Sequence, residues 1–290
     1  MNQEHNFVVR ISRYPYHSDY PQFCQRILDK LIEQNPKCVR TALELISSEY
    51  KSYHDKHTDR KIYPVDDTSR YGRARVLVTR RLVTLAQNGY DYDDRDKFYR
   101  PVKLLRDRVV ALLRRGLDPD KEIDCQFDRG NMTVKFVHKE DGREIELTKI
   151  DIMPGFEKVI HTGLTPEKND MLGELVNKRL ELVRSEERHK MDKHRAVYEI
   201  YSLISHWTPF DRRSATAARL IQLWAANSAG VAVYPTIEGW DCNMIALTNS
   251  PVKFLDQMTR FTARDSSNPR LPESSESINL WHQTRGGLIR

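Results

Sequence analysis

Hydrophobic residues recur at every third or fourth position through most of this chain, which is the spacing of one face of an α-helix. Near the N-terminus this spacing predicts two helices, Tyr20–Gln34 and Cys38–Tyr53, with Asn35-Pro36 between them. The Asn-Pro pair favours a boundary because a residue before proline is biased away from the helical conformation. The basic segment Ser69–Gln87 has helical spacing too, and we expect a further helix there.

Helical spacing resumes in the middle of the chain and continues to residue 261. Pro101 and the pair Thr165-Pro166 suit the first turn of a helix, because proline has no N–H to lose there and threonine accepts one from the backbone. Later helical faces recur at spacings of three and four residues over Val197–Ile204, Ala217–Trp224 and Pro251–Phe261. The chain is therefore predicted to be mostly α-helical.

The segment Met132–Leu147 has a different period. Hydrophobic and polar residues alternate from Met132 to Phe136 and again from Glu144 to Leu147, as they do in β-strands. Asp141-Gly142 lies between the two runs, and this dipeptide is a strong signal for a tight hairpin turn. The sequence predicts a β-hairpin over residues 132–147, inserted in a helical protein.

The order of these elements divides the chain into three regions. Residues 1–95 form an N-terminal helical region, and residues 96–262 form a core that contains the hairpin. From Ala263 the composition changes to polar residues and prolines, so residues 263–290 are expected to be a flexible tail.

Composition narrows the classes of protein. The 290 residues include 47 basic and 41 acidic ones, a formal net charge of +6, so the surface carries mixed charge and nucleic acid is not an expected partner. No apolar run approaches the roughly 18 residues of a membrane-spanning helix. Asn2 replaces the glycine that N-myristoylation requires, and the first residues lack the pattern of a secretory signal. We expect neither a membrane span nor N-myristoylation.

The four cysteines are scattered and have no CxxC spacing. In a chain of this length that distribution is typical of free thiols in a reducing compartment. No metal site is predicted from them.

The segment His206–Gly230 holds the clearest candidate chemistry. His206 is followed by Arg212 and Arg213, and then by a helix of small residues. Unpaired N–H groups at a helix N-terminus and guanidinium groups both bind anions, and nucleotide phosphates are typical ligands of such a site. The ordinary alternatives are that His206 caps the end of its helix and that the arginines are a solvated pair.

Several blocks of the sequence resemble the Fic/Doc superfamily, and in particular its AvrB-like type III effectors. His206 and Pro209-Phe210 resemble the Fic active-site motif, although its Gly-Asn-Gly turn is missing. Asp211–Ala215 resembles the corresponding AvrB run, and Pro101–Lys103 and the hairpin segment Thr133–Leu147 resemble earlier AvrB blocks in the same order. The resemblance covers residues 97–258.

This resemblance implies a Fic/AvrB-like two-lobed helical fold with an inserted β-hairpin and a cleft for a nucleotide or nucleotide-sugar. The implied reaction is transfer of a glycosyl group to a host immune-regulatory protein, with nucleotidyl transfer as the second option. The implied setting is a plant cell, into whose cytoplasm a bacterium secretes the effector. The alternative location is the bacterial cytoplasm.

The resemblance also implies site residues. Those expected to bind the nucleotide or its phosphates are Arg212, Arg213 and Thr162. Those expected to act in catalysis are His161, Asp241 and His206. Arg212 matches the phosphate-binding arginine of the cleft, and Arg213 could take its place. Asp241 matches a cleft aspartate, with Asn243 as the alternative if the register shifts by two residues.

Two other functions stay open at this point. The missing Gly-Asn-Gly turn favours a Fic-fold module that has lost its chemistry and acts by docking to host proteins. The arginines of the Ser69–Gln87 segment would suit a nucleic-acid-binding protein, which is the third interpretation.

Overall fold

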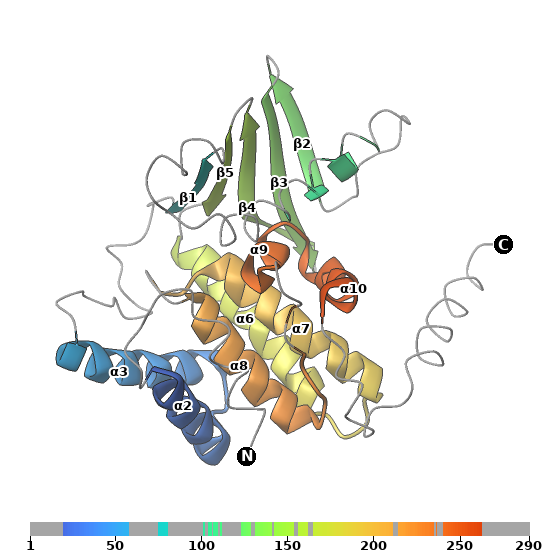
Figure 1. Cartoon of the computed structure of the whole chain (residues 1–290). Coiled ribbons are helices and arrows are strands. Elements are labelled where there is room, and N and C mark those ends of the chain that lie inside the picture. The colour runs from blue at the N-terminus through green and yellow to red at the C-terminus, as the bar shows by residue number, and fades with distance from the viewer. Residues whose placement is uncertain are drawn as a thin grey trace.

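The computed structural model describes the part of the chain that contains its helices and its sheet. The described ranges are 20–57, 75–80, 123–128, 131–140, 142–153, 156–161, 165–210, 214–234, 236 and 240–262, with 101, 104, 105, 107–109 and 111. We call the last set the 101–111 segment, and all of its described residues are helical. The described residues are mostly helical, as predicted, and an antiparallel sheet stands on one end of the helical bundle (Figure 1).

Three helices form the centre of the bundle: α6 (Pro166–Arg184), α7 (Lys190–Trp207) and α8 (Ser214–Ala229). Helix α7 contacts both of the others, and all of its residues from Ala196 to Trp207 are buried. A helix that is buried on every side needs apolar residues all round, and α7 has them on more than one face. The predicted start of α6 is confirmed, because the Thr165 side chain accepts a hydrogen bond from the Lys168 backbone N–H.

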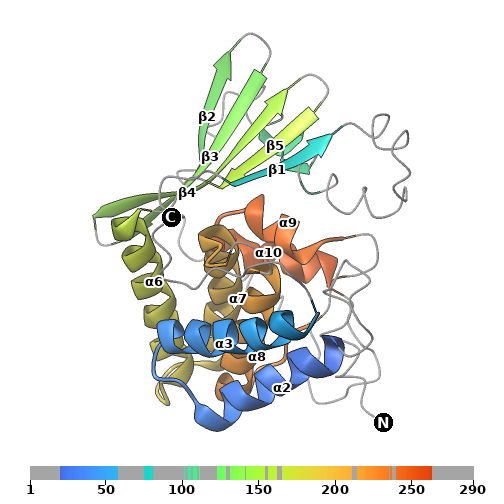
Figure 2. The same ribbon diagram turned by 90° about the vertical axis from the view of Figure 1, so that its left-hand side faces the viewer.

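Helices α2 (Tyr20–Gln34) and α3 (Val39–His57) confirm the two helices expected near the N-terminus. They lie across one side of the bundle and contact α8 and α6 (Figure 2). The Arg184 guanidinium at the end of α6 holds the loop between them, since it donates to the carbonyls of Lys37 and Pro36 and to Asn35 Oδ1. The same group lies 5.1 Å from the centre of the Trp224 ring.

Five strands form one antiparallel sheet in the order β1-β5-β4-β3-β2. Their bounds are Arg75–Arg80, Ile123–Asp128, Asn131–Glu140, Arg143–Met153 and Phe156–His161 for β1 to β5. The predicted hairpin is confirmed as β3 and β4, and Gly142 in its turn has the positive φ (73°) that favours glycine. The hairpin forms the centre of the sheet, so its β3 strand is paired with β2 along Asn131–Phe136.

The helix expected over Ser69–Gln87 is wrong where the structure describes it. Residues Arg75–Arg80 are strand β1, which pairs antiparallel with β5. Val76, Val78 and Thr79 are β-branched and favour strands, and pairing with β5 outweighs the helical spacing of the longer segment. Strand β1 belongs to residues 1–95 and pairs with a strand of residues 96–262, while the tail 263–290 lies outside the described residues.

A bulge in the hairpin changes which residues face the bundle. The register shifts between Phe136 and Val137, so that Phe136 pairs with Thr148 and Val137 pairs with Glu146. Leu147 is the extra residue on β4. The buried positions of β4 therefore change phase, with Ile145 and Leu147 buried before the bulge and Thr148 and Ile150 after it. The bulge thus places a polar side chain, Thr148, on the buried face of the sheet.

We predict that Arg184→Lys lowers the free energy of unfolding by about 1–2 kcal/mol, because lysine cannot keep the forked set of hydrogen bonds to the α2–α3 loop. Urea unfolding followed by circular dichroism measures the change. Arg188→Lys is the matched control, since Arg188 is an exposed arginine in the turn after α6. Equal stability of the two variants would contradict a role of Arg184 in holding the loop.

Candidate functional site

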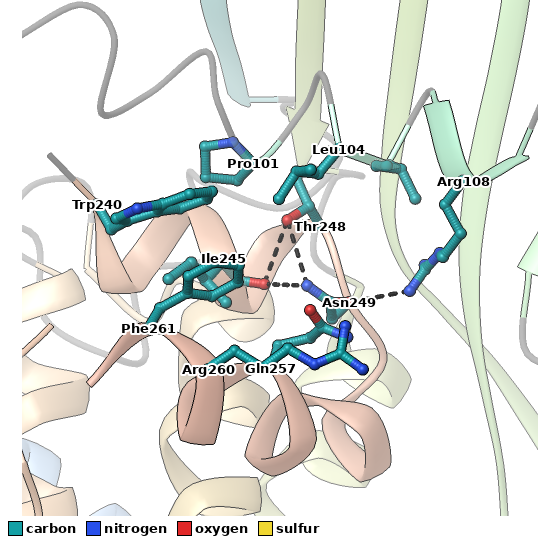
Figure 3. A pocket seen from close by; sticks show the side chains of 11 residues that line it. Pro101, Leu104, Arg108, Trp240, Ile245, Thr248, Asn249, Gln257, Arg260 and Phe261 are labelled. Atoms are coloured by element: carbon teal, nitrogen blue, oxygen red, sulfur yellow. Dashed lines mark hydrogen bonds between the residues drawn. The ribbon is translucent and has the colours of Figure 1, made fainter. Parts of the chain in front are cut away.

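A cavity lies where the 101–111 segment meets α9 (Cys242–Leu247) and α10 (Pro251–Phe261) (Figure 3). Its volume is about 370 Å³, within the range of about 300–1,000 Å³ that is usual for small-molecule sites. Its walls combine apolar side chains such as Leu104 and Ile245 with two aromatic rings, two arginines and a polar corner. This mixture is typical of a site for a ligand that has both an apolar and a charged part.

One wall of the cavity is aromatic. The rings of Trp240 and Phe261 are stacked, with 3.9 Å between their centres and 21° between their planes. An isolated bridge between Thr236 and Thr262 brings the two chain segments together next to this stack. Both rings are only partly buried, so a flat aromatic ligand can reach them from the cavity.

The cavity also has two positively charged side chains, which are arginines from different elements. Arg108 comes from the 101–111 segment and Arg260 from the last turn of α10. In Figure 3 both guanidinium groups lie away from Trp240. No acidic side chain of the described residues lines the cavity, so these two positive charges favour an anionic ligand.

The polar corner between α9 and α10 is held rigidly. The Thr248 hydroxyl donates to the Met244 carbonyl at 2.8 Å, and the Asn249 amide nitrogen donates to the Ile245 carbonyl at 2.8 Å. Asn249 thus bonds to a carbonyl at the end of α9, and the Thr248 hydroxyl adds a second bond to the Met244 carbonyl, which also accepts from the Thr248 backbone N–H. Asn249 Oδ1 accepts a hydrogen bond from Arg108 at 3.2 Å, so the corner also contacts one of the cavity arginines.

His206 lies behind this corner and does not line the cavity. It is 2% exposed, with Nδ1 2.6 Å from the Thr148 hydroxyl and Nε2 3.1 Å from the Asn249 carbonyl. A carbonyl only accepts, so Nε2 carries the proton and Nδ1 accepts from Thr148. Burial is the main cause that lowers the pKa of His206 to about 4; the charges of Lys168 and His138 act in the same direction, and the hydrogen bond to the Asn249 carbonyl opposes it. The ring is therefore neutral at physiological pH.

Asp241 begins α9. Its Oδ1 accepts a hydrogen bond from the Met244 backbone N–H at 2.8 Å, which makes it the N-cap of that helix. It directly follows Trp240, whose ring lines the cavity. Asn243, the alternative position, lies in the first turn of the same helix. A catalytic role of Asp241 stays a prediction.

His161 is the last residue of β5, where its backbone pairs with Thr148 of β4. Thr148 is also the residue that bonds to His206, so the sheet brings the positions of the two predicted histidines close to one β4 residue. The predicted phosphate-binding residues Thr162, Arg212 and Arg213 lie outside the described residues. Their expected contacts with a ligand stay predictions.

Spacing and motifs in the sequence do not reveal the residues that shape the cavity: Arg108, Trp240, Asn249, Arg260 and Phe261. One weak signal was available for Arg108. It lies four residues after Leu104, so both occupy the same face of the helix that was predicted to begin at Pro101. The others come together through the packing of α9 and α10, which no local spacing reveals.

Comparison with known protein families gave no match, and a search of curated protein sequences found no similar protein. In the part of the chain that the structure describes, no helix is long and apolar enough to cross a membrane. The same residues contain no group of three or more histidine, cysteine, aspartate or glutamate side chains arranged to hold a metal ion.

We predict that acidification destabilises the protein through His206. The unfolded histidine binds a proton near pH 6.5 and the folded one only near pH 4, so between these values the unfolded state gains protons that the folded state does not. The free energy of unfolding should fall by about 2 kcal/mol from pH 7 to pH 5 from this residue alone. Urea unfolding at both pH values measures it.

The control for this prediction is His206→Gln, which cannot titrate. Between pH 7 and pH 5 the free energy of unfolding should fall less in the variant than in the wild type, and the difference is the contribution of His206. Because the comparison uses the difference between two pH values, any constant effect of the substitution cancels. An identical pH dependence in both proteins would contradict a buried neutral histidine.

The role of Asp241 as an N-cap can also be tested, because one substitution removes only its charge and another removes its capping oxygen as well. Asp241→Asn keeps an oxygen that accepts from the Met244 N–H, whereas Asp241→Ala does not. We expect Asp241→Ala to lose about 1 kcal/mol of stability and Asp241→Asn to lose much less. Thermal unfolding measures both. A similar loss in the two variants would argue against the capping role.

Proposed function

We propose that this protein binds a nucleotide or nucleotide-sugar in the cavity between the 101–111 segment, α9 and α10, and transfers a glycosyl group from it to a host protein. The observation that carries the proposal is the composition of this cavity. It pairs a stacked aromatic wall, Trp240 and Phe261, with two arginines, Arg108 and Arg260. The resemblance to AvrB-like effectors supplies the reaction, the host setting and the two-lobed Fic/AvrB-like fold of the proposal.

A nucleotide fits both chemical features of the cavity. Its base is a flat aromatic ring that can pack against the exposed part of the Trp240–Phe261 stack. Its phosphates are the anions that guanidinium groups bind best, through paired N–H donors. The volume of about 370 Å³ leaves room for a nucleoside and part of its phosphates.

In the proposed reaction, a hydroxyl oxygen of the acceptor protein attacks the anomeric carbon of the donor sugar. The bond from that carbon to the phosphate oxygen breaks, and its electron pair leaves with the nucleoside diphosphate. The arginines stabilise the negative charge that grows on the leaving phosphate. The hydroxyl proton passes to a carboxylate, and our candidate is Asp241, which the resemblance to AvrB-like effectors implies and which follows the cavity residue Trp240 in the chain.

A second function has support from His206. Fic-type chemistry would use the motif histidine as a base next to the ligand, but His206 is buried and both ring nitrogens have protein partners. Together with the missing Gly-Asn-Gly turn, this favours a module that binds a nucleotide or a host protein without transferring a group. The two proposals differ in turnover, because only the first consumes the donor.

We predict that the wild type binds ADP, UDP-sugars or dTDP-sugars in isothermal titration calorimetry, and that Arg260→Gln weakens binding about tenfold because one charge-assisted contact to phosphate is lost. Arg260 is exposed, so this substitution should leave the fold intact. Arg188→Gln is the matched control, an exposed arginine in the α6–α7 turn. Arg212→Ala tests the phosphate contact that the resemblance implies.

The outcomes separate the candidate functions. Absence of binding by the wild type to every donor would overturn the nucleotide-binding proposal. Binding that Arg260→Gln leaves unchanged would place the ligand elsewhere in the molecule. Binding with steady release of nucleoside diphosphate, followed by chromatography, supports transfer, whereas binding without any release supports the docking module.

A further inference from the structure

We propose that His206 is a positioning residue, which orients the anion-binding Arg108 of the cavity by holding Asn249. This inference rests on the proposed function for the role of Arg108, and it assigns His206 a task other than proton transfer. Three hydrogen bonds in series carry the argument, joining Thr148 to His206, His206 to Asn249, and Asn249 to Arg108. Their lengths are 2.6, 3.1 and 3.2 Å.

The four residues of this series come from four separate parts of the fold. Thr148 is on β4, His206 is in the last turn of α7, Asn249 joins α9 to α10, and Arg108 is in the 101–111 segment. Because none is close to another in sequence, the series exists only in the folded protein. It runs from the buried face of the sheet to the wall of the cavity.

Asn249 can hold Arg108 in only one orientation of its amide. The amide nitrogen donates to the Ile245 carbonyl at 2.8 Å, which turns Oδ1 toward the Arg108 guanidinium. A guanidinium group only donates, so the reversed amide would place two donors against each other. Asn249 Oδ1 thereby gives the Arg108 guanidinium a fixed acceptor, and Figure 3 shows the hydrogen bond between them.

His206 fixes the backbone from which that side chain extends. Its Nε2–H donates to the Asn249 carbonyl, which fixes this tautomer because a carbonyl only accepts, and the Thr148 hydroxyl donates to Nδ1 on the other side of the ring. The β-bulge puts Thr148 on the buried face, where it can reach the ring. The charged and titratable groups that face His206 are Lys168 of α6 and His138 of β3, and both favour the neutral ring.

This geometry also explains why His206 is not placed to act on a ligand. The ring does not line the cavity, and its two nitrogens are engaged on opposite sides by protein atoms. A substitution should therefore act on ligand affinity through Arg108. It should not act through loss of a base.

Two substitutions separate these contributions. The amide nitrogen of His206→Gln reaches about as far as Nε2 and can still donate to the Asn249 carbonyl. The shorter side chain of His206→Asn reaches only toward Thr148. We expect His206→Gln to keep the Kd for ADP within about threefold of the wild type, and His206→Asn to raise it about tenfold.

A double-mutant cycle shows whether the effect passes through Arg108. His206→Asn and Arg108→Gln should be strongly non-additive, because both remove the same contact to ADP. His206→Asn and Arg260→Gln should be nearly additive, since Arg260 is exposed and is not part of the series. Additivity in both cycles would overturn the inference.

A measurement without ligand keeps the test independent of the proposed function. Nuclear magnetic resonance of the Arg108 Nε–H reports how ordered its side chain is, and the His206 ring nitrogen shifts report the tautomer. We expect an ordered Arg108 in the wild type and in His206→Gln, a mobile one in His206→Asn, and an Nε2–H tautomer of His206. An ordered Arg108 in His206→Asn, or an Nδ1–H tautomer, would overturn the inference.

The two proposals can therefore fail separately. If the wild type binds no nucleotide but Arg108 loses its order in His206→Asn, the proposed function fails and the positioning role stands. If the wild type binds ADP and both His206 variants bind it equally, the positioning role fails and the proposed function stands.

Discussion

The complete burial of the second half of α7 is the constraint on which the rest of the structure depends. The polar side chains of a helix enclosed on every side have no water to bond to, and several of those on α7 bond to neighbouring elements instead. Glu199 finds Arg179 of α6 at 2.6 Å, Trp207 donates to Asn169 of α6 at 3.0 Å, and His206 bonds to both β4 and the α9–α10 corner. Each of these contacts fixes a surrounding element relative to α7.

The cavity is a consequence of this arrangement. Helices α9 and α10 meet at Asn249, which α7 anchors through His206, and the 101–111 segment approaches the same corner through Arg108. The walls of the cavity therefore come from separate elements that are joined at Asn249, which His206 holds. Because the support is a neutral histidine, the cavity gains no charge from it, and among the described lining residues the charge comes from the two arginines.

The sequence predicted those features that depend on neighbouring residues. The helices at Tyr20–Gln34 and Pro251–Phe261, the cap at Thr165 and the hairpin turn at Gly142 all follow from local spacing or turn chemistry. Strand β1 could not be predicted in this way, because its partner β5 lies about 80 positions later in the chain.

The candidate site shows the same limit. The motif points to His206, but its bonding partners come from β4, next to the bulge, and from Asn249, more than 40 residues away in the chain. The cavity aromatics Trp240 and Phe261 share no spacing that would predict their stack.

The bulge between Phe136 and Val137 also determines where the hairpin can change in length. Loss or gain of one residue at Leu147 would turn Thr148 away from α7, whereas a longer turn at Gly142 would leave that phase intact, so natural length variation in this hairpin should be confined to its tip.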